Sequence, residues 1–280
     1  MVSPLIDCTA LASLEDNIAV FDCRFDLADP GAGRRAFEEG HIPGAAFLDL
    51  ERDLSAPGPA EAGRHPLPDR AAFAARLRAL GVRSSDRVVV YDDGGGALAA
   101  RAWWMLRWVG HAAVALLDGG LAAWRSEARP LARGAAAARP PGDLVAGDPL
   151  VTTVDTADIF AALGTGALVV LDARTSARFA GEPHPLDTAS GHIPGALNRF
   201  WGDNLTAEGR FKPAARLRAD YAALLGDVAP DRVVLQCGSG VTACHDLLAL
   251  EVAGLPGARL YPGSWSAWTS DPARPIDRAV

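Results

Sequence analysis

Residues 231–244 read Asp-Arg-Val-Val-Leu-Gln-Cys-Gly-Ser-Gly-Val-Thr-Ala-Cys. The continuous apolar run before Gln236 is typical of a strand that is buried on both faces of a sheet. The small residues that follow predict a tight loop, and from Thr242 onward the apolar residues recur at helical spacing. The stretch therefore predicts a strand, a loop and a helix, with Cys237 at the carboxyl end of the strand. Open α/β sheets bind their ligands at that edge.

The chain repeats itself over the length of a domain. The matching pairs, all in the same order, are residues 19–24 and 169–174, 40–45 and 191–196, 86–90 and 231–235, and 119–124 and 263–268. Their offset is nearly constant, which indicates a duplicated domain rather than a solenoid of small repeats. We expect one domain at residues 1–128 and a second at 149–280. Between them, residues 129–148 are rich in Pro, Gly and Ala and suit a linker.

Within each copy, short apolar runs alternate with stretches of helical periodicity. One example is residues 69–80, whose apolar positions predict a helix that ends at Gly81. Strands that alternate with helices indicate a parallel sheet covered on both faces. The predicted fold class is α/β, with two tandem domains that each hold a mainly parallel sheet between helices.

Composition narrows the class of protein further. Of the 280 residues, 49% are hydrophobic and 22% charged, which is the balance of a globular protein, and the net charge of -7 argues against a nucleic-acid binder. No apolar run approaches the roughly 20 residues that would cross a bilayer. The first residues show neither a basic nor an apolar signal segment, so we expect a cytoplasmic protein. The four cysteines lack C-x-x-C spacing, and we expect neither a metal nor an organic cofactor.

The two copies differ at Cys237, because the first copy has Asp92 in its place. Backbone N–H groups of a glycine-rich loop and the start of a helix both stabilise an anion, which favours a reactive thiolate at this position. A cysteine after a buried strand is otherwise more often an inert apolar residue. Cys244 is interpreted as a buried helix residue, with a resolving partner for Cys237 as the alternative. For Cys8 and Cys23 we expect buried structural roles.

The order of these motifs resembles that of the tandem-domain rhodanese-type sulfurtransferases over nearly the whole chain. The loop at residues 237–244 is similar to that of members that use 3-mercaptopyruvate, whereas relatives that prefer thiosulfate carry basic residues after the cysteine. The resemblance implies that sulfur moves from 3-mercaptopyruvate to a Cys237 persulfide, with release of pyruvate. A second nucleophile, such as a low-molecular-weight thiol, thioredoxin or cyanide, then accepts the sulfur.

The resemblance also implies a set of site residues. Cys237, Ser239 and His41 are the expected catalytic residues, with Ser239 and His41 in a Ser-His-Asp arrangement. The expected substrate-binding residues are Arg174, Arg178, Arg101, Gly238, Gly240, Val241 and Thr242. Arg174 repeats Arg24, and His41 is repeated by His192, so a structural role stays open for both. Asp29 is the nearest candidate for the acid, although its register does not fit.

Three alternatives remain open at the level of sequence. A thiosulfate sulfurtransferase would use the same cysteine, and a sulfur-carrying or regulatory module would not catalyse a reaction at all. A cysteine phosphatase would need an arginine at the end of the loop, where this chain has Ala243 and Cys244. The phosphatase is therefore disfavoured.

Overall fold

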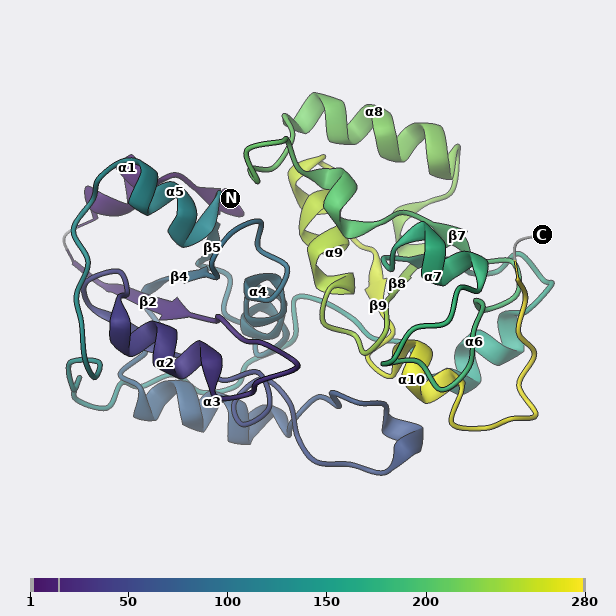
Figure 1. Cartoon of the computed structure of the whole chain (residues 1–280), viewed down its shortest axis with the longest axis horizontal. Coiled ribbons are helices and arrows are strands. Elements are labelled where there is room, and N and C mark those ends of the chain that lie inside the picture. The colour runs from purple at the N-terminus through teal and green to yellow at the C-terminus, as the bar shows by residue number, and fades with distance from the viewer. Residues whose placement is uncertain (1–2, 15, 279–280) are drawn as a thin grey trace. The chain divides into compact units, whose positions relative to one another are not determined.

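A computed structural model describes residues 3–14 and 16–278 and divides the chain into two compact units (Figure 1). The first unit comprises the residues up to 56 together with 68–150 and 205–211, and the second comprises 57–67, 151–204 and the residues from 212 onward. Each half of the sequence thus gives a short segment to the unit formed by the other half. Residues 129–148 are part of the first unit, where Ala132 and His41 exchange backbone hydrogen bonds of 2.9 and 3.0 Å.

The first unit is built on a five-stranded parallel sheet in the order β1-β5-β4-β2-β3. Its strands are β1 (Leu5–Ile6), β2 (Ile18–Asp22), β3 (Ala45–Phe47), β4 (Arg87–Tyr91) and β5 (Val114–Leu117). Its helices are α1 (Cys8–Ala12), α2 (Ala32–Glu39), α3 (Arg70–Ala79), α4 (Ala99–Trp108) and α5 (Gly120–Ser126). The predicted helix over 69–80 is confirmed as α3, with Asp69 capping its first turn and Gly81 at a φ of +89° after its end.

The second unit repeats this plan with a four-stranded parallel sheet in the order β7-β6-β8-β9. Its strands are β6 (Val169–Asp172), β7 (Leu197–Asn198), β8 (Val233–Gln236) and β9 (Arg259–Leu260). Its helices are α6 (Thr156–Ala162), α7 (Ser176–Ala180), α8 (Ala214–Leu225), α9 (Ala243–Val252) and α10 (Ser264–Trp268), with 3₁₀ turns η1 (Ala60–Ala62), η2 (Trp201–Asn204) and η3 (Pro230–Arg232). The predicted α/β fold with two tandem parallel-sheet units is confirmed.

Both faces of each sheet are buried, as the continuous apolar strands predict. In β8 the side chains of Val233, Val234 and Leu235 are all fully buried. Val234 belongs to a core cluster with Trp265 and other residues of the α10 face, and α9 packs against β8 and β9. The neighbouring strands β6 and β8 end in register, with Asp172 opposite Gln236. The polar side chains of Asp172 and Gln236 therefore lie together at the carboxyl edge of the sheet.

The segment 57–67 lies against α10 within the second unit. Figure 1 shows the loop that carries η1 reaching α10, and these two elements are in contact. Gly63 has a φ of +87°, and a side-chain carbon at this position would lie 2.5 Å from the carbonyl oxygen of Gly263. Only glycine permits so close an approach of two backbones. The next residue, Arg64, donates its backbone N–H to Ser266 Oγ at 3.0 Å.

A cluster of buried polar side chains in the second unit joins η2 and α8 to α9. Asn204 Nδ2 donates to Asp246 Oδ1 at 2.5 Å, and the Tyr221 hydroxyl donates to the same oxygen at 3.2 Å. Burial raises the pKa of Asp246 to about 7, and the bond from Asn204 opposes the rise. Among the described residues, Asp246 Oδ2 is buried without a hydrogen-bond partner. A protonated Asp246 suits these surroundings better than a charged one.

The Asp246→Asn variant tests this protonation. The folded protein keeps a proton on Asp246 that the unfolded chain releases above about pH 4. The free energy of unfolding therefore falls as pH rises from about 4 to about 7, and this contribution is constant above that range. Asparagine imitates the neutral acid and removes the dependence. In urea titrations from pH 5 to pH 8, the stability of the variant relative to the wild type should increase. A difference that does not change with pH would contradict a neutral Asp246.

Candidate active site

The loop that carries Cys237 is held between β8 and the start of α10. The Cys237 N–H donates to Ser264 Oγ at 3.1 Å, and its carbonyl oxygen accepts from the Trp265 N–H at 3.0 Å. Gly240 has a φ of +76°, and a side-chain carbon here would lie 2.4 Å from the Pro262 carbonyl oxygen. The loop is therefore a rigid turn that needs glycine at this position. Cys237 itself is only 2% exposed.

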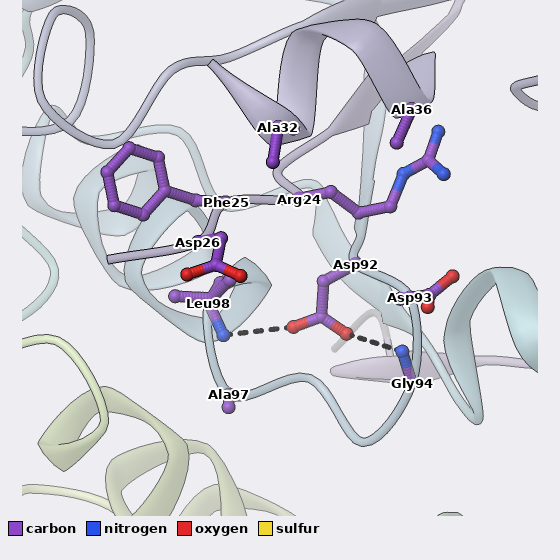
Figure 2. Close-up of a pocket in the computed structure, with 11 residues that line it drawn as sticks. Arg24, Phe25, Asp26, Ala32, Ala36, Asp92, Asp93, Gly94, Ala97 and Leu98 are labelled. Atoms are coloured by element: carbon purple, nitrogen blue, oxygen red, sulfur yellow. Dashed lines mark hydrogen bonds between the residues drawn. The ribbon is translucent and has the colours of Figure 1, made fainter. Parts of the chain in front are cut away.

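The first unit shows what a loop of this type can hold. Asp92 occupies the position of Cys237, and one of its carboxylate oxygens accepts from the N–H groups of Gly94 and Gly96 at 3.1 and 3.0 Å. The other accepts from Leu98 and Ala99 at 2.9 and 3.2 Å. Figure 2 shows the carboxylate turned into the loop, with two of these bonds drawn. Burial raises the pKa of Asp92, and the four N–H groups oppose the rise. This loop is a cradle of backbone donors for an anion.

The second unit has a corresponding loop after β8, with Cys237 at the position of Asp92, although Val241 does not share the positive φ of its counterpart Gly96. Ser239 and Val241 correspond to Gly94 and Gly96, and within the described chain their N–H groups have no hydrogen-bond acceptor. Buried N–H groups are rarely left without a partner. We infer that these donors surround the place of an anionic atom attached to Cys237. Gly238, Gly240 and Thr242 shape the turn, and Thr242 is the N-cap residue of α9.

Ser239 forms a hydrogen bond with a histidine that the sequence analysis did not single out. His65 Nδ1 lies 2.8 Å from Ser239 Oγ, and both side chains are buried. His65 reaches the loop because the segment 57–67 belongs to the second unit. A hydroxyl bonded to an imidazole can pass a proton to or from a reacting atom. One signal could have drawn attention to His65: unlike His41, it has no counterpart in the second copy.

Two guanidinium groups flank the residue after the cysteine. A side-chain carbon on Gly238 would lie 3.0 Å from Nη2 of Arg178 and 3.2 Å from Nη2 of Arg64. Arg178 pairs with Asp187 through two bonds of 2.9 and 2.6 Å. Arg64 Nη1 donates to the Leu186 carbonyl oxygen at 2.7 Å. The loop has no charged side chain of its own, and its positive charge comes from these neighbouring segments.

Comparison with known proteins gives the family of this chain. Residues 9–127 and 156–271 each match the rhodanese-like domain. The chain belongs to the rhodanese-like family. A Pseudomonas aeruginosa protein named as a 3-mercaptopyruvate sulfurtransferase is 51% identical over 264 residues, which are 94% of this chain and 93% of the relative. A Mycobacterium tuberculosis protein named as a thiosulfate sulfurtransferase is 43% identical over 95% of this chain and 92% of its own. The crystal structure of the Escherichia coli 3-mercaptopyruvate sulfotransferase SseA has a TM-score of 0.81 at 35% identity, covering 94% of this chain and 99% of that one.

Ser239 bonds to His65 in this rhodanese-like protein, and the catalytic role expected of His41 stays a prediction. His41 belongs to the first unit, where Nδ1 lies 2.8 Å from the Phe37 carbonyl oxygen and the ring stacks on Phe37 at 3.8 Å. His192 repeats this arrangement on Phe179, with the same two distances. A motif that recurs with the same contacts in both units is a structural turn. Asp29, the candidate acid, pairs instead with Arg35 on an exposed surface.

The contacts of Arg174 are structural, and its expected role in substrate binding stays a prediction. Its guanidinium is 1% exposed and pairs with Asp172 at 2.7 Å, and Nη2 donates to the Gly191 carbonyl oxygen at 2.7 Å. Arg24 makes the corresponding bonds to Asp22 and Gly40 in the first unit. Both pairs fasten the His-Ile-Pro-Gly turn to the end of a central strand. Their role is structural.

Arg101 lies in the first unit, on α4, and is fully buried, with bonds of 3.4 and 3.3 Å to the Leu54 carbonyl oxygen. Its contribution to substrate binding therefore stays a prediction. The remaining cysteines are buried thiols. Burial raises the pKa of Cys8 to about 11 and that of Cys23 well above its ordinary value, so neither suits a nucleophile. Cys244 is fully buried, with Sγ 3.4 Å from the Gly240 carbonyl oxygen.

No group of three or more His, Cys, Asp or Glu side chains among the described residues is placed to hold a metal ion. Across the same residues, no helix is both long and apolar enough to span a membrane.

Replacement of Arg174 by methionine distinguishes a structural role from a role in binding. The variant leaves the Asp172 carboxylate buried and without its ion-pair partner, which costs about 3–5 kcal/mol of stability. Urea unfolding should show this loss, and Arg24→Met should show a similar one in the first unit. The matched control is Arg216→Gln, because Arg216 is 67% exposed and its pair with Asp220 is worth at most about 1 kcal/mol. Wild-type stability of Arg174→Met, together with a raised KM for a donor, would restore Arg174 as a binding residue.

Proposed function

We propose that this chain is a sulfurtransferase that takes sulfur from 3-mercaptopyruvate and passes it through a persulfide of Cys237 to a thiol or cyanide. The observation that carries the proposal is the anion cradle, which is filled by Asp92 in the first unit and presents Cys237 in the second. The identities of 51% and 37% to relatives named as 3-mercaptopyruvate sulfurtransferases support the choice of donor.

The first half-reaction moves one sulfur atom and needs one proton. The Cys237 thiolate attacks the sulfur of 3-mercaptopyruvate, a new S–S bond forms, and the C–S bond breaks. The electron pair of that bond leaves with the carbon as the enolate of pyruvate, which takes up a proton to become pyruvate. Ser239 would donate this proton and His65 would return one to the serine, and the 2.8 Å between their side chains supports this relay.

The second half-reaction returns the cysteine to its starting form. An acceptor thiolate or cyanide attacks the outer sulfur of the persulfide, and the Cys237 thiolate leaves. The N–H groups of Ser239 and Val241 would stabilise negative charge on the persulfide, as those of Gly94 and Gly96 do for the Asp92 carboxylate. A small thiol or thioredoxin in the cytoplasm is the proposed acceptor.

Intact-protein mass after brief exposure to a donor tests the nucleophile. The wild type should gain the mass of one sulfur atom, and Cys237→Ser should gain none. Cys244→Ser should load like the wild type, because Cys244 is buried in α9. Faster loading from thiosulfate than from 3-mercaptopyruvate would favour the thiosulfate sulfurtransferase. No gain from either donor would overturn the proposed activity and leave the sulfur-carrying or regulatory module.

Kinetics with the two donors distinguish an effect of a substitution on proton transfer from an effect on sulfur transfer. Thiosulfate releases sulfite, which needs no proton, whereas 3-mercaptopyruvate releases an enolate. Ser239→Ala and His65→Asn should therefore lower kcat/KM for 3-mercaptopyruvate by about 10²- to 10⁴-fold, with a much smaller loss for thiosulfate. His41→Gln should change the stability of the first unit and leave the ratio of the two donors as in the wild type. Equal losses for both donors in the Ser239 and His65 variants would show that the pair does not act as a proton relay.

A further inference from the structure

The charged side chains around the Cys237 loop include more guanidinium groups than carboxylates. Three guanidinium groups belong to this set, and two of them are neutralised: Arg174 pairs with Asp172, and Arg178 forms a two-bond pair with Asp187. Asp187 also lies 3.6 Å from Nη1 of Arg174. Within residues 3–14 and 16–278, no carboxylate forms an ion pair with Arg64. The guanidinium groups of this set outnumber its carboxylates by one, and Arg64 is the group with which no carboxylate of the described chain pairs.

Arg64 is not an ordinary surface arginine. Its Nε is buried and has no hydrogen-bond partner among the described residues, while Nη1 is fixed by the Leu186 carbonyl oxygen at 2.7 Å. Its backbone is held in turn by the bond to Ser266. Burial lowers the pKa of Arg64, and the negative charges of Cys237 and Asp187 oppose this shift. A partly buried guanidinium that forms no ion pair with a carboxylate gains stability from an anion that binds to it.

The position of Arg64 fits an anion bound next to the reacting sulfur. Its Nη2 lies 3.2 Å from the point where a side chain of Gly238 would begin, and Gly238 directly follows Cys237. Because Gly238 has no side chain, both guanidinium groups can lie this close to the loop. In 3-mercaptopyruvate, only the methylene and keto carbons separate the sulfur from the carboxylate, so the donor is short enough for a guanidinium group beside Gly238 to pair with its carboxylate while its sulfur meets Cys237.

Resting on the proposed function, we propose that Arg64 binds the anionic group of the sulfur donor, and that Asp187 selects monoanionic donors by cancelling the charge of Arg178. A carboxylate matches the single positive charge that remains. A dianion such as thiosulfate would need a second positive charge, and the ion pair with Asp187 neutralises the charge of Arg178. Asp187 is thus a specificity-determining residue, and it acts through Arg178 rather than by touching the donor.

Replacement of Arg64 tests the binding role. Arg64→Gln should raise KM for 3-mercaptopyruvate about 10- to 100-fold, with a smaller change in kcat, because the charge-assisted bond to the carboxylate is lost. Arg64→Lys keeps the charge but lacks the planar guanidinium fork, so its KM for 3-mercaptopyruvate should lie between those of the wild type and Arg64→Gln. Arg216→Gln, on an exposed face of α8, should leave KM unchanged. A wild-type KM in Arg64→Gln would overturn the binding role.

Replacement of Asp187 tests the selection of donors. Asp187→Asn keeps the shape of the side chain and frees the charge of Arg178, so the ratio of kcat/KM for thiosulfate to that for 3-mercaptopyruvate should rise about tenfold or more. Thermal unfolding of the variant shows whether the fold is intact, and the ratio is measured on folded protein. An unchanged or lower ratio would contradict the proposal.

The wild type separates failure of this inference from failure of the proposed function. If wild-type protein gains no sulfur from either donor, the proposed function itself fails. If it gains sulfur normally while the Arg64 and Asp187 variants leave KM and the donor ratio as they were, only the assignment of these two residues fails.

Discussion

In the loops that follow β4 and β8, the backbone N–H groups need hydrogen-bond acceptors. The acceptor that each loop contains determines what its site can do. A buried donor without a partner costs about 1–3 kcal/mol, so a turn that points several donors inward needs an anion at its centre. In the first unit that anion is permanent, because the Asp92 carboxylate takes four of these bonds. In the second unit the corresponding place belongs to Cys237. Corresponding loops thus give a closed structural turn in one copy and the proposed site for a charged sulfur in the other.

A second constraint comes from the arginines that the fold itself needs. The pairs Arg24–Asp22 and Arg174–Asp172 tie the two His-Ile-Pro-Gly turns to the ends of their strands, and both are buried. Because these carboxylates neutralise the arginines that support the fold, the arginines are not available to a substrate. The charge that meets a donor has to come from a different segment, and in this chain Arg64 supplies it from the segment 57–67, next to His65.

Much of this could be predicted from sequence because it is local or repeated. The strand before Cys237, its glycine-containing loop and the helix after it all follow from neighbouring residues, and the duplication showed which loop had lost its cysteine. His65 and Arg64 could not be found in this way. They reach the site only because residues 57–67 leave the half of the chain to which they belong in sequence and join the second unit.

The contacts of His41 and Arg174 within their own units could not be read from the sequence for a related reason. Both residues stand in repeated motifs, and the sequence does not show whether a side chain faces a substrate or a carbonyl oxygen of its own unit. For His41 that oxygen belongs to Phe37, and for Arg174 it belongs to Gly191. Repetition favours a structural role for both residues, since their counterparts in the other unit make the same contacts.

A crystal structure of the protein after brief exposure to 3-mercaptopyruvate would test the anion cradle, from which the proposed chemistry follows. The proposed chemistry predicts one additional sulfur atom on Cys237, within hydrogen-bonding distance of the N–H groups of Ser239 and Val241, in the place that corresponds to the Asp92 carboxylate. An added sulfur that points away from these donors, or its attachment to another cysteine, would contradict the proposal that the loop stabilises a persulfide.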